Sequence, residues 1–222
     1  MPKRTKRTPP DASFELSLRT RGFVAIAGVD EVGRGTLAGP VVAGAVVLPA
    51  DLPSDGLELI RDSKQLSPAQ RLRSAEYIER YAVSFACGAA DAMEIDRIGI
   101  VSATRNAMAR AVDLLEPAPD HLLVDALELP GIPLPQTSVI KGDTRCLSIA
   151  AASVIAKVTR DRVMTTVWED KFPGYGFAAH KGYGTATHLE ALRELGPIAG
   201  HRLTFAPVRE VAAVFGITAG RI

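Results

Sequence analysis

Short apolar runs alternate along the chain with longer stretches in which apolar residues recur at helical spacing. Residues 23–29 and 37–49 form two runs long enough for buried strands, and the glycine-rich segment between them predicts a hairpin. Residues 83–90 can form a third strand. Two shorter segments, 121–124 and 137–140, predict further strands later in the chain.

Three segments predict helices. Ser67 supplies a hydroxyl cap, Pro68 stands at the first helical position and Gln70 completes a capping box, so we expect a helix over residues 68–80. Residues 100–115 carry apolar side chains with a period of about 3.6.

The third helical segment, residues 147–168, follows the same period, and its alanines at 150, 151 and 152 would allow close contact with a sheet. Strands that alternate with helices predict an α/β fold, a mixed sheet covered by helices on both faces. We expect one domain over residues 21–210. A basic, disordered leader over 1–20 and a C-terminal tail over 211–222 should flank it.

The composition is that of an ordinary globular protein. The chain has 222 residues, 47% hydrophobic and 23% charged, and no apolar run reaches the roughly 18 residues that span a bilayer. No apolar segment follows the basic N-terminus, so we expect neither export nor membrane insertion but a cytoplasmic protein. Two cysteines, Cys87 and Cys146, are too few for a disulfide framework.

Positive charge is concentrated at the N-terminus, at Lys3, Arg4, Lys6 and Arg7. Subtracting these four charges from the net charge of +1 leaves −3 for the rest of the chain. The overall field therefore does not attract nucleic acid, and a nucleic-acid ligand would need a local basic patch.

Carboxylates follow three of the apolar segments. Asp30 and Glu31 come after the first run, Asp125 after residues 121–124, and Asp143 just beyond 137–140. Two charges about 4 Å apart repel by about 4 kcal/mol at an intermediate dielectric, unless a cation or a proton relieves them. Ligands of open α/β sheets gather outside the strand ends, where oxygen ligands suit Mg²⁺.

Each acid taken alone has a plainer interpretation, as a turn former or a helix cap. Asp143 could cap the helix that starts near Leu147. The repetition of the pattern at three strand ends favours a shared metal site. His180, His188 and His201 could suggest zinc, but they lack cysteine partners and close ligand spacing.

Six ordered segments resemble bacterial ribonuclease HII. They are GVDEVGRG (28–35), DSKQLS (62–67), KGDTR (141–145), SIAAASVIAKVTRD (148–161), HKGYGT (180–185) and HRLTFAPV (201–208). The resemblance implies a ribonuclease H-like fold, with a mixed five-stranded sheet, flanking helices and additional C-terminal helices. It also implies an endonuclease that cleaves RNA in RNA/DNA hybrids and incises 5′ of single ribonucleotides in duplex DNA.

The resemblance further implies roles for individual residues. Its metal-binding acids match Asp30, Glu31, Asp125 and Asp143, which would use Mg²⁺ or Mn²⁺ to leave 5′-phosphate and 3′-hydroxyl ends. Gly33, Arg34 and Gly35 match the turn that contacts the ribonucleotide 2′-hydroxyl, and Tyr183 matches the residue that stacks on the next deoxyribose. Candidate phosphate contacts are Lys64, Lys141, Lys181 and Arg202, with Ser63, Lys157 and Arg160 as further candidates.

Three positions depart from the usual pattern: Thr36, Gly99 and Ala126. They bear on loop geometry more than on the class of reaction, because the acids and the Gly33–Gly35 turn are intact.

Two alternatives stay open. Ribonuclease HIII shares the fold but has an extra N-terminal domain and another residue at position 34, whereas only about 20 residues precede the first strand here. The other is a catalytically silent hybrid-binding protein, against which the complete set of acids argues. Nothing in the sequence indicates an obligate protein partner, and we expect a monomer.

Overall fold

A computed structural model describes residues 9–217, so the four basic residues near the N-terminus lie outside the described chain. The strands are β1 (Ile26–Val32), β2 (Val41–Val47), β3 (Ser84–Ala90), β4 (His121–Asp125) and β5 (Gln136–Val139). The helices are α1 (Ser13–Arg19), α2 (Pro68–Tyr81), α3 (Ala92–Ile98), α4 (Ile100–Asp113), α5 (Leu147–Val163), α6 (Glu169–Lys171), α7 (Phe177–His180), α8 (Ala186–Leu195) and α9 (Ala206–Val214).

The five strands form one mixed sheet in the order β3-β2-β1-β4-β5. β1 and β2 pair antiparallel, as the predicted hairpin requires, and β3 extends this antiparallel part. β1, β4 and β5 run parallel. The predicted mixed five-stranded sheet is confirmed.

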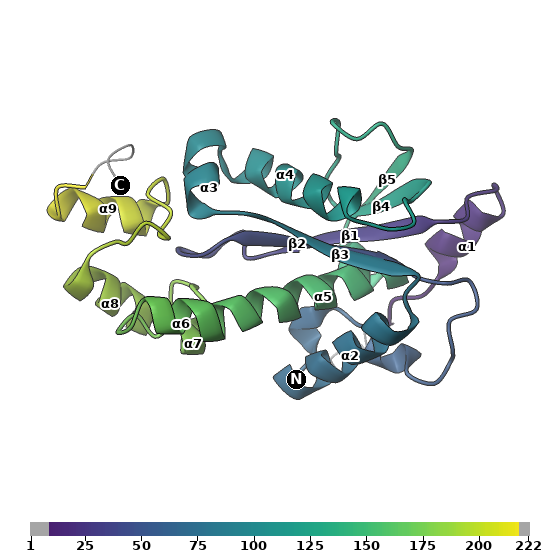
Figure 1. The fold of residues 1–222 in the computed structure, drawn as a ribbon, viewed down its shortest axis with the longest axis horizontal. Coiled ribbons are helices and arrows are strands. Elements are labelled where there is room, and N and C mark those ends of the chain that lie inside the picture. The colour runs from purple at the N-terminus through teal and green to yellow at the C-terminus, as the bar shows by residue number, and fades with distance from the viewer. Residues whose placement is uncertain (1–8, 218–222) are drawn as a thin grey trace, which may run out of the picture.

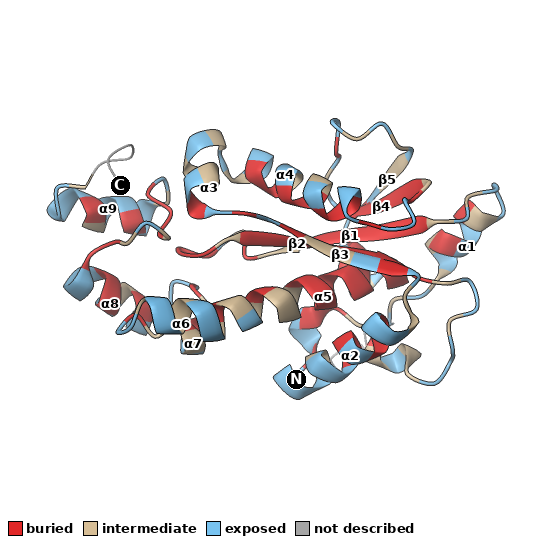
Figure 2. Cartoon of the chain, in the orientation of Figure 1, coloured by how far each residue is buried: buried red, intermediate tan, exposed pale blue. Residues whose placement is uncertain are grey.

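Helices cover both faces of this sheet (Figure 1). α4 lies on one face, where its apolar side packs against residues of β1, β2 and β4 such as Val29, Val41 and Val124. α5 and α2 lie on the other face, and buried residues line the sides of α4 and α5 that meet the sheet (Figure 2). The capping box predicted for α2 is present, with Ser67 accepting from Gln70 N–H and Gln70 from Ser67 N–H.

The main chain of α5 packs directly against the main chain of the sheet, because two strand residues are glycines without a side chain. A Cβ atom on Gly28 of β1 would lie 2.1 Å from the carbonyl carbon of Ser148, and one on Gly44 of β2 would lie 2.4 Å from the carbonyl oxygen of Ala152. The close packing predicted from the small residues of this helix is confirmed. It sets the height of α5 over the centre of the sheet.

The C-terminal helices α7, α8 and α9 extend the molecule beyond one end of the sheet (Figure 1). The segment that follows β1 holds them through its main chain. Leu37 N–H donates to the carbonyl of Gly182 at 2.8 Å, and the Leu37 carbonyl accepts from Arg202 N–H at 2.9 Å. The C-terminal part is thereby fastened to the loop that contains the Gly33–Gly35 turn.

Three sequence predictions need correction. Residues 1–20 are not a disordered leader throughout, because α1 is a helix whose Glu15 accepts a hydrogen bond from Ser148 N–H at 2.8 Å. The tail does not begin at 211, because α9 continues to Val214. Asp30 and Glu31 do not follow β1 but lie inside it, since the strand continues to Val32. Among residues 9–217, no helix has the length and apolarity to cross a membrane.

The contact between α5 and β1 yields a first prediction. Gly28→Ala should lower the free energy of unfolding by about 1–3 kcal/mol, the usual cost of overpacking a dense core, because the added methyl group overlaps the main chain of α5. Urea unfolding followed by circular dichroism measures this change. Gly131→Ala is the matched control, since a Cβ there meets no atom within 4 Å. Equal stability of the two variants would contradict the proposed packing constraint.

Candidate active site

The parallel strands β1, β4 and β5 end at one edge of the sheet, and the predicted acids gather there. The β1–β4 register pairs Val29 with Val124, so Asp30 and Asp125 are the next residues of adjacent strands. Glu31 follows at once, with its side chain on the opposite face of β1, because side chains alternate along a strand. Asp30 is buried, with 3% of its surface exposed.

Asp143 joins this edge through a turn rather than a strand. It lies in the 3₁₀ turn Gly142–Thr144 after β5, and the N–H of Gly142 donates to Asp125 Oδ1 at 2.7 Å. The N-cap of α5 is Cys146, with no side-chain cap hydrogen bond, so the interpretation of Asp143 as the helix cap is wrong. The structure thus brings acids from β1, β4 and the turn after β5 to one edge.

Three of these carboxyl groups are disfavoured as anions. Burial raises the pKa of Asp30 well above its usual range, and the charges of Glu31 and Asp125 raise it further. Burial also raises the pKa of Glu31, although Arg34 opposes the rise. Burial raises the pKa of Asp125 as well, although the hydrogen bond from Gly142 N–H lowers it in part. A cation bound at this edge would offset the cost of burying these carboxylates and the repulsion between them.

Two side chains already bring positive charge to the acids. Arg34 Nη1 lies 3.2 Å from Glu31 Oε1, and Lys64 Nζ lies 3.1 Å from Asp143 Oδ2. Burial lowers the pKa of Lys64, but the ion pair with Asp143 outweighs it and leaves that pKa raised. Asp62 holds the loop of Lys64, because its Oδ1 accepts from Lys64 N–H at 2.9 Å.

The donor set fits a hard divalent cation. All four groups are carboxylates, and Glu31 Oε2 is buried with no hydrogen-bond partner. Within the described chain, no three His, Cys, Asp or Glu side chains already stand as a metal-binding group. The unpaired oxygen and the mutual repulsion make these four carboxylates the residues of this edge that could hold a hard divalent cation.

The side chain of Arg202 holds the Gly33–Gly35 turn through hydrogen bonds to its main chain. This side chain is fully buried, and its guanidinium donates to the carbonyls of Gly33 at 2.7 Å, Arg34 at 2.8 Å and Gly39 at 2.9 Å. The prediction that Arg202 contacts a phosphate is therefore wrong. Its donors face the main chain of the turn, so Arg202 is a positioning residue.

Arg160 holds the same segment from α5. It is fully buried and donates to Pro40 O at 2.8 Å, Thr36 Oγ1 at 3.0 Å and Lys181 O at 2.9 Å. Burial lowers its pKa, and neither it nor Arg202 pairs with a carboxylate of residues 9–217. Gly33 has a φ of +86°, and a Cβ there would lie 2.2 Å from Arg160 Nε.

Sequence reasoning left Arg160 as one candidate phosphate contact among several and missed its structural role. A signal was available in the spacing of α5. Ser148, Ala152, Ala156 and Arg160 recur every four residues on the stripe that faces the sheet. A single cation on an otherwise small and buried stripe must satisfy its donors inside the protein.

Tyr183 lies beside the turn that these arginines hold. Its side chain is 39% exposed, and its ring lies 5.6 Å from Lys157 Nζ and 5.9 Å from the Arg160 guanidinium carbon. Gly182, the preceding residue, accepts the hydrogen bond from Leu37 described above. The loop of Tyr183 is thus fastened to the segment that follows the Gly33–Gly35 turn.

The three C-terminal histidines form a buried cluster close to Tyr183. The rings of His180 and His188 stack with centroids 4.2 Å apart, and His188 Nε2 lies 3.1 Å from His201 Nε2. Burial lowers the pKa of His188 to about 4 and that of His201 to about 3. His188 Nδ1 lies 2.9 Å from the Tyr183 carbonyl, so the histidine cluster supports the loop of Tyr183.

The remaining predicted lysines differ in their surroundings. Lys181 Nζ donates to the carbonyl of Ala178, and Lys181 has a left-handed backbone with a φ of 52°. Lys141 is exposed, also with a left-handed backbone, in the turn next to Asp143. Ser63 Oγ lies 2.9 Å from Ser153 Oγ.

Comparisons with known proteins agree with this geometry. A family model described as Ribonuclease HII matches residues 27–208. A ribonuclease HII from Dehalococcoides mccartyi is 52% identical over 200 residues, which cover 90% of this chain and 94% of that protein. The chain belongs to the ribonuclease HII family. It is an endoribonuclease of the ribonuclease H type, which cleaves RNA in RNA/DNA hybrids.

Solved structures support the fold. The ribonuclease H2 from Pyrococcus horikoshii OT3 has a TM-score of 0.70 and 24% identity, over 87% of this chain and 99% of that one. The structure of the PCNA:RNase HII complex from Archaeoglobus fulgidus has a TM-score of 0.67 and 27% identity, over 82% and 95% of the two chains. The predicted ribonuclease H-like fold is confirmed.

The three departures from the ribonuclease HII pattern have structural consequences. Thr36 is buried, and its hydroxyl contacts the carbonyls of Gly33 and Ala38, both at 3.0 Å, while it accepts from Arg160. Ala126 has a left-handed φ of 50°, which costs a non-glycine residue about 1–2 kcal/mol. Gly99 has φ 81° and ψ 155°, a region open essentially to glycine alone.

The raised pKa of Asp30 yields a second prediction. In a chelator at pH 8, Asp30→Asn should be more stable than the wild type by about 1–3 kcal/mol, the cost of an incompletely compensated buried group. The folded wild type holds the Asp30 proton to higher pH than the unfolded chain. The stability gap should therefore shrink as the pH falls through the raised pKa towards the unfolded value near 3.8.

Urea unfolding of both proteins between pH 5 and pH 8 measures this gap. The contributions of the histidines cancel in the difference, because both proteins contain them. A gap that does not change with pH would show that Asp30 has an ordinary pKa in the folded chain.

Proposed function

We propose that this chain incises duplex DNA 5′ of single embedded ribonucleotides, in a divalent-metal-dependent reaction that leaves 5′-phosphate and 3′-hydroxyl ends. One observation carries the proposal: four carboxylates gather at the sheet edge next to the Gly33–Gly35 turn, and the loop with the exposed ring of Tyr183 is hydrogen-bonded to Leu37, two residues after that turn. Chemistry and substrate recognition can therefore act on neighbouring groups of one strand.

The acids are proposed as the metal site. Asp30, Glu31, Asp125 and Asp143 would hold Mg²⁺ or Mn²⁺, and bound divalent ions would supply an activated water and stabilise the leaving 3′ oxygen. The chain itself contributes the fixed positions of the carboxylates. Lys64 and Arg34 limit repulsion at this edge, since each pairs with one acid.

The turn is proposed as the sensor of the 2′-hydroxyl. The carbonyls of Gly33 and Arg34 accept from Arg202, so the main-chain N–H groups of the turn and the Arg34 donors that do not pair with Glu31 are left for a ligand. Gly35 has an ordinary φ, and a Cβ there would meet no atom within 4 Å. The fold does not require glycine at this position, whereas close approach of a sugar would.

Tyr183 is proposed to stack on the deoxyribose that follows the ribonucleotide. Its exposed ring next to the held turn supports this role. Lys64 and Lys141, both near Asp143, are proposed phosphate contacts. We further propose that the enzyme is cytoplasmic and monomeric, and that it needs no protein partner for the reaction.

A nicking assay tests the proposed function. The wild type should nick a DNA duplex with one ribonucleotide on its 5′ side when Mg²⁺ or Mn²⁺ is present, and it should not do so in a chelator. Asp30→Asn should lower kcat at least about a thousandfold, because a metal-holding carboxylate is lost while the fold remains. Asp113→Asn, which changes an exposed acid at the end of α4, is the control and should keep full activity.

Two results would overturn the assignment. One is full turnover by Asp30→Asn with normal metal dependence. The other is a gel shift of the same duplex by the wild type without any nicking, which would support a silent hybrid-binding protein.

The role of Tyr183 yields a separate prediction. Tyr183→Ala should lower kcat/KM for a single embedded ribonucleotide about tenfold more than for a long RNA/DNA hybrid, because it removes one stacking contact of about 1–3 kcal/mol. Tyr183→Phe keeps the ring and should retain the preference. Equal losses on both substrates in the alanine variant would refute a role in recognising the junction.

A further inference from the structure

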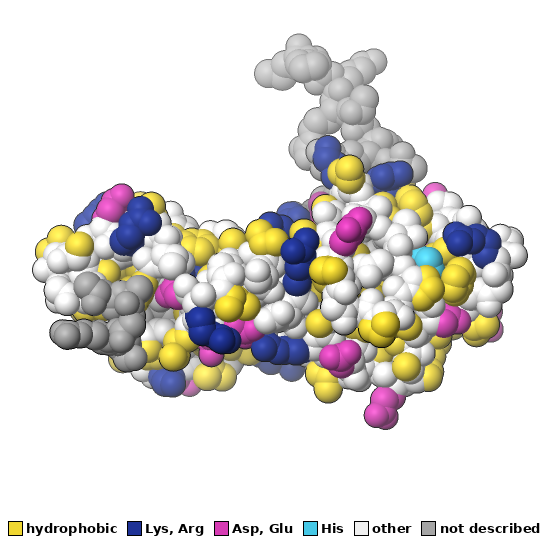
Figure 3. All heavy atoms as spheres, turned by 90° about the horizontal axis from the view of Figure 1, so that it is seen from above, with side chains coloured by type: hydrophobic (Ala, Val, Ile, Leu, Met, Phe, Trp, Pro, Cys, Tyr) yellow, Lys and Arg dark blue, Asp and Glu magenta, His cyan; other side chains and the backbone are white. Residues whose placement is uncertain are grey.

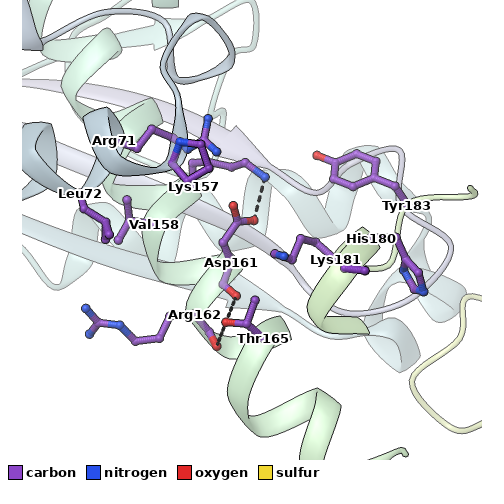
Figure 4. A pocket seen from close by; sticks show the side chains of 12 residues that line it. Arg71, Leu72, Lys157, Val158, Asp161, Arg162, Thr165, His180, Lys181 and Tyr183 are labelled. Carbon is purple, nitrogen blue, oxygen red and sulfur yellow. Dashed lines mark hydrogen bonds and ion pairs between the residues drawn. The ribbon is translucent and has the colours of Figure 1, made fainter. Parts of the chain in front are cut away.

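A basic groove lies next to Tyr183, on the face of the sheet covered by α2 and α5. Its volume is about 610 Å³, within the range of sites that take small molecules or nucleotide-sized groups. The start of α2 forms one side, the second half of α5 the floor, and the loop after α7 the other side (Figure 4). Its charged lining residues are Arg71, Lys157, Asp161, Arg162 and Lys181.

The groove concentrates positive charge, although the chain outside its leader is acidic. Four of its lining residues are cations and one is a carboxylate. On the opposite face, over α3 and α4, the visible acidic and basic side chains are interspersed and form no single-sign patch (Figure 3). A local basic surface of this kind favours a polyanion.

The cations of the groove differ in how many of their donors are already bonded within the protein. Arg71 Nη1 donates to the carbonyls of Ser63 and Leu66, and Lys157 Nζ lies 2.7 Å from Asp161 Oδ1. Arg162 is exposed, and its guanidinium donates no hydrogen bond to the described part of the chain. Its donors are therefore available to a ligand.

The groove is continuous with the candidate active site at two points. Arg71 holds the carbonyl of Ser63, and the next residue, Lys64, contacts Asp143. On the other side, Tyr183 and Lys181 face the α5 side chains across the groove (Figure 4). A strand that passes from the acids over the ring of Tyr183 leads directly into the basic lining.

We propose that this groove binds the phosphates of the DNA segment on the 3′ side of the ribonucleotide, beyond the deoxyribose at Tyr183. The proposal rests on the proposed function, because Tyr183 sets the direction of the strand. Arg162 is the principal phosphate contact, and Lys157 joins it by exchanging its ion pair with Asp161 for a phosphate. The enzyme should then depend on the length of DNA that follows the ribonucleotide, and not only on the sugar sequence at the junction.

The test measures binding without cleavage. In a chelator, fluorescence anisotropy gives the Kd of a duplex with one ribonucleotide and about ten deoxynucleotides on its 3′ side, and of a duplex in which only one deoxynucleotide follows. Lys157→Gln with Arg162→Gln should raise the Kd of the long duplex about tenfold and flatten its salt dependence by about one to two in log–log slope. The Kd of the short duplex should change little.

Two controls keep the result interpretable. Arg73→Gln with Arg80→Gln removes the same charge from exposed positions of α2 that do not line the groove, and should leave both Kd values unchanged. Arg162→Gln alone breaks no hydrogen bond of the described chain and should show about half of the effect on the salt slope. Urea unfolding establishes that each variant is folded.

The outcomes separate the two proposals. Equal Kd values for wild type and groove variants on the long duplex, or equal losses on both duplexes, would overturn the groove as a site for DNA on the 3′ side. Absence of nicking by the wild type with metal would overturn the proposed function, whereas the binding measurement would still report on the groove.

Discussion

The structure depends on the contact at which α5 rests directly on the main chain of β1 and β2. Gly28 and Gly44 permit this contact, since a methyl group at either position would overlap α5. Ser153 on this helix lies near Asp30 and opposes the rise in its pKa, and Arg160 lies two turns further along. A shift of α5 would therefore move the environment of the acids and the support of the Gly33–Gly35 turn together.

Electrostatics explains why the acids and the turn belong to one site. Burial and mutual repulsion raise the pKa of Asp30, Glu31 and Asp125, and this cost remains as long as no cation compensates it. Arg34 belongs both to the turn and to the ion pair with Glu31. The residue proposed to recognise the sugar thus also neutralises an acid, which couples substrate recognition to the charge of the site.

The C-terminal part is held by a different principle, hydrogen bonds from buried guanidinium groups to main-chain carbonyls. Arg160 and Arg202 satisfy their donors almost entirely on the segment from Gly33 to Pro40 and on Lys181. Because carbonyls carry only partial charges, burial and the nearby charge of Arg160 lower the pKa of Arg202 to about 9. Such groups favour one geometry, since any displacement leaves a buried charge without partners.

Local patterns in the sequence determined most of the fold. The hairpin, α2 with its capping box and the small residues of α5 follow from hydrophobic periodicity and short-range signals, and the acids were predicted from their places after apolar segments. Only the tertiary structure decided that Arg202 and Arg160 bind main-chain carbonyls and that α1 packs against the start of α5. Whether a cation meets solvent, a phosphate or a buried carbonyl depends on residues more than 100 positions away, as Arg202 and Gly33 show. No local pattern contains that information, because the energy of a buried charge is set by the groups that surround it in space.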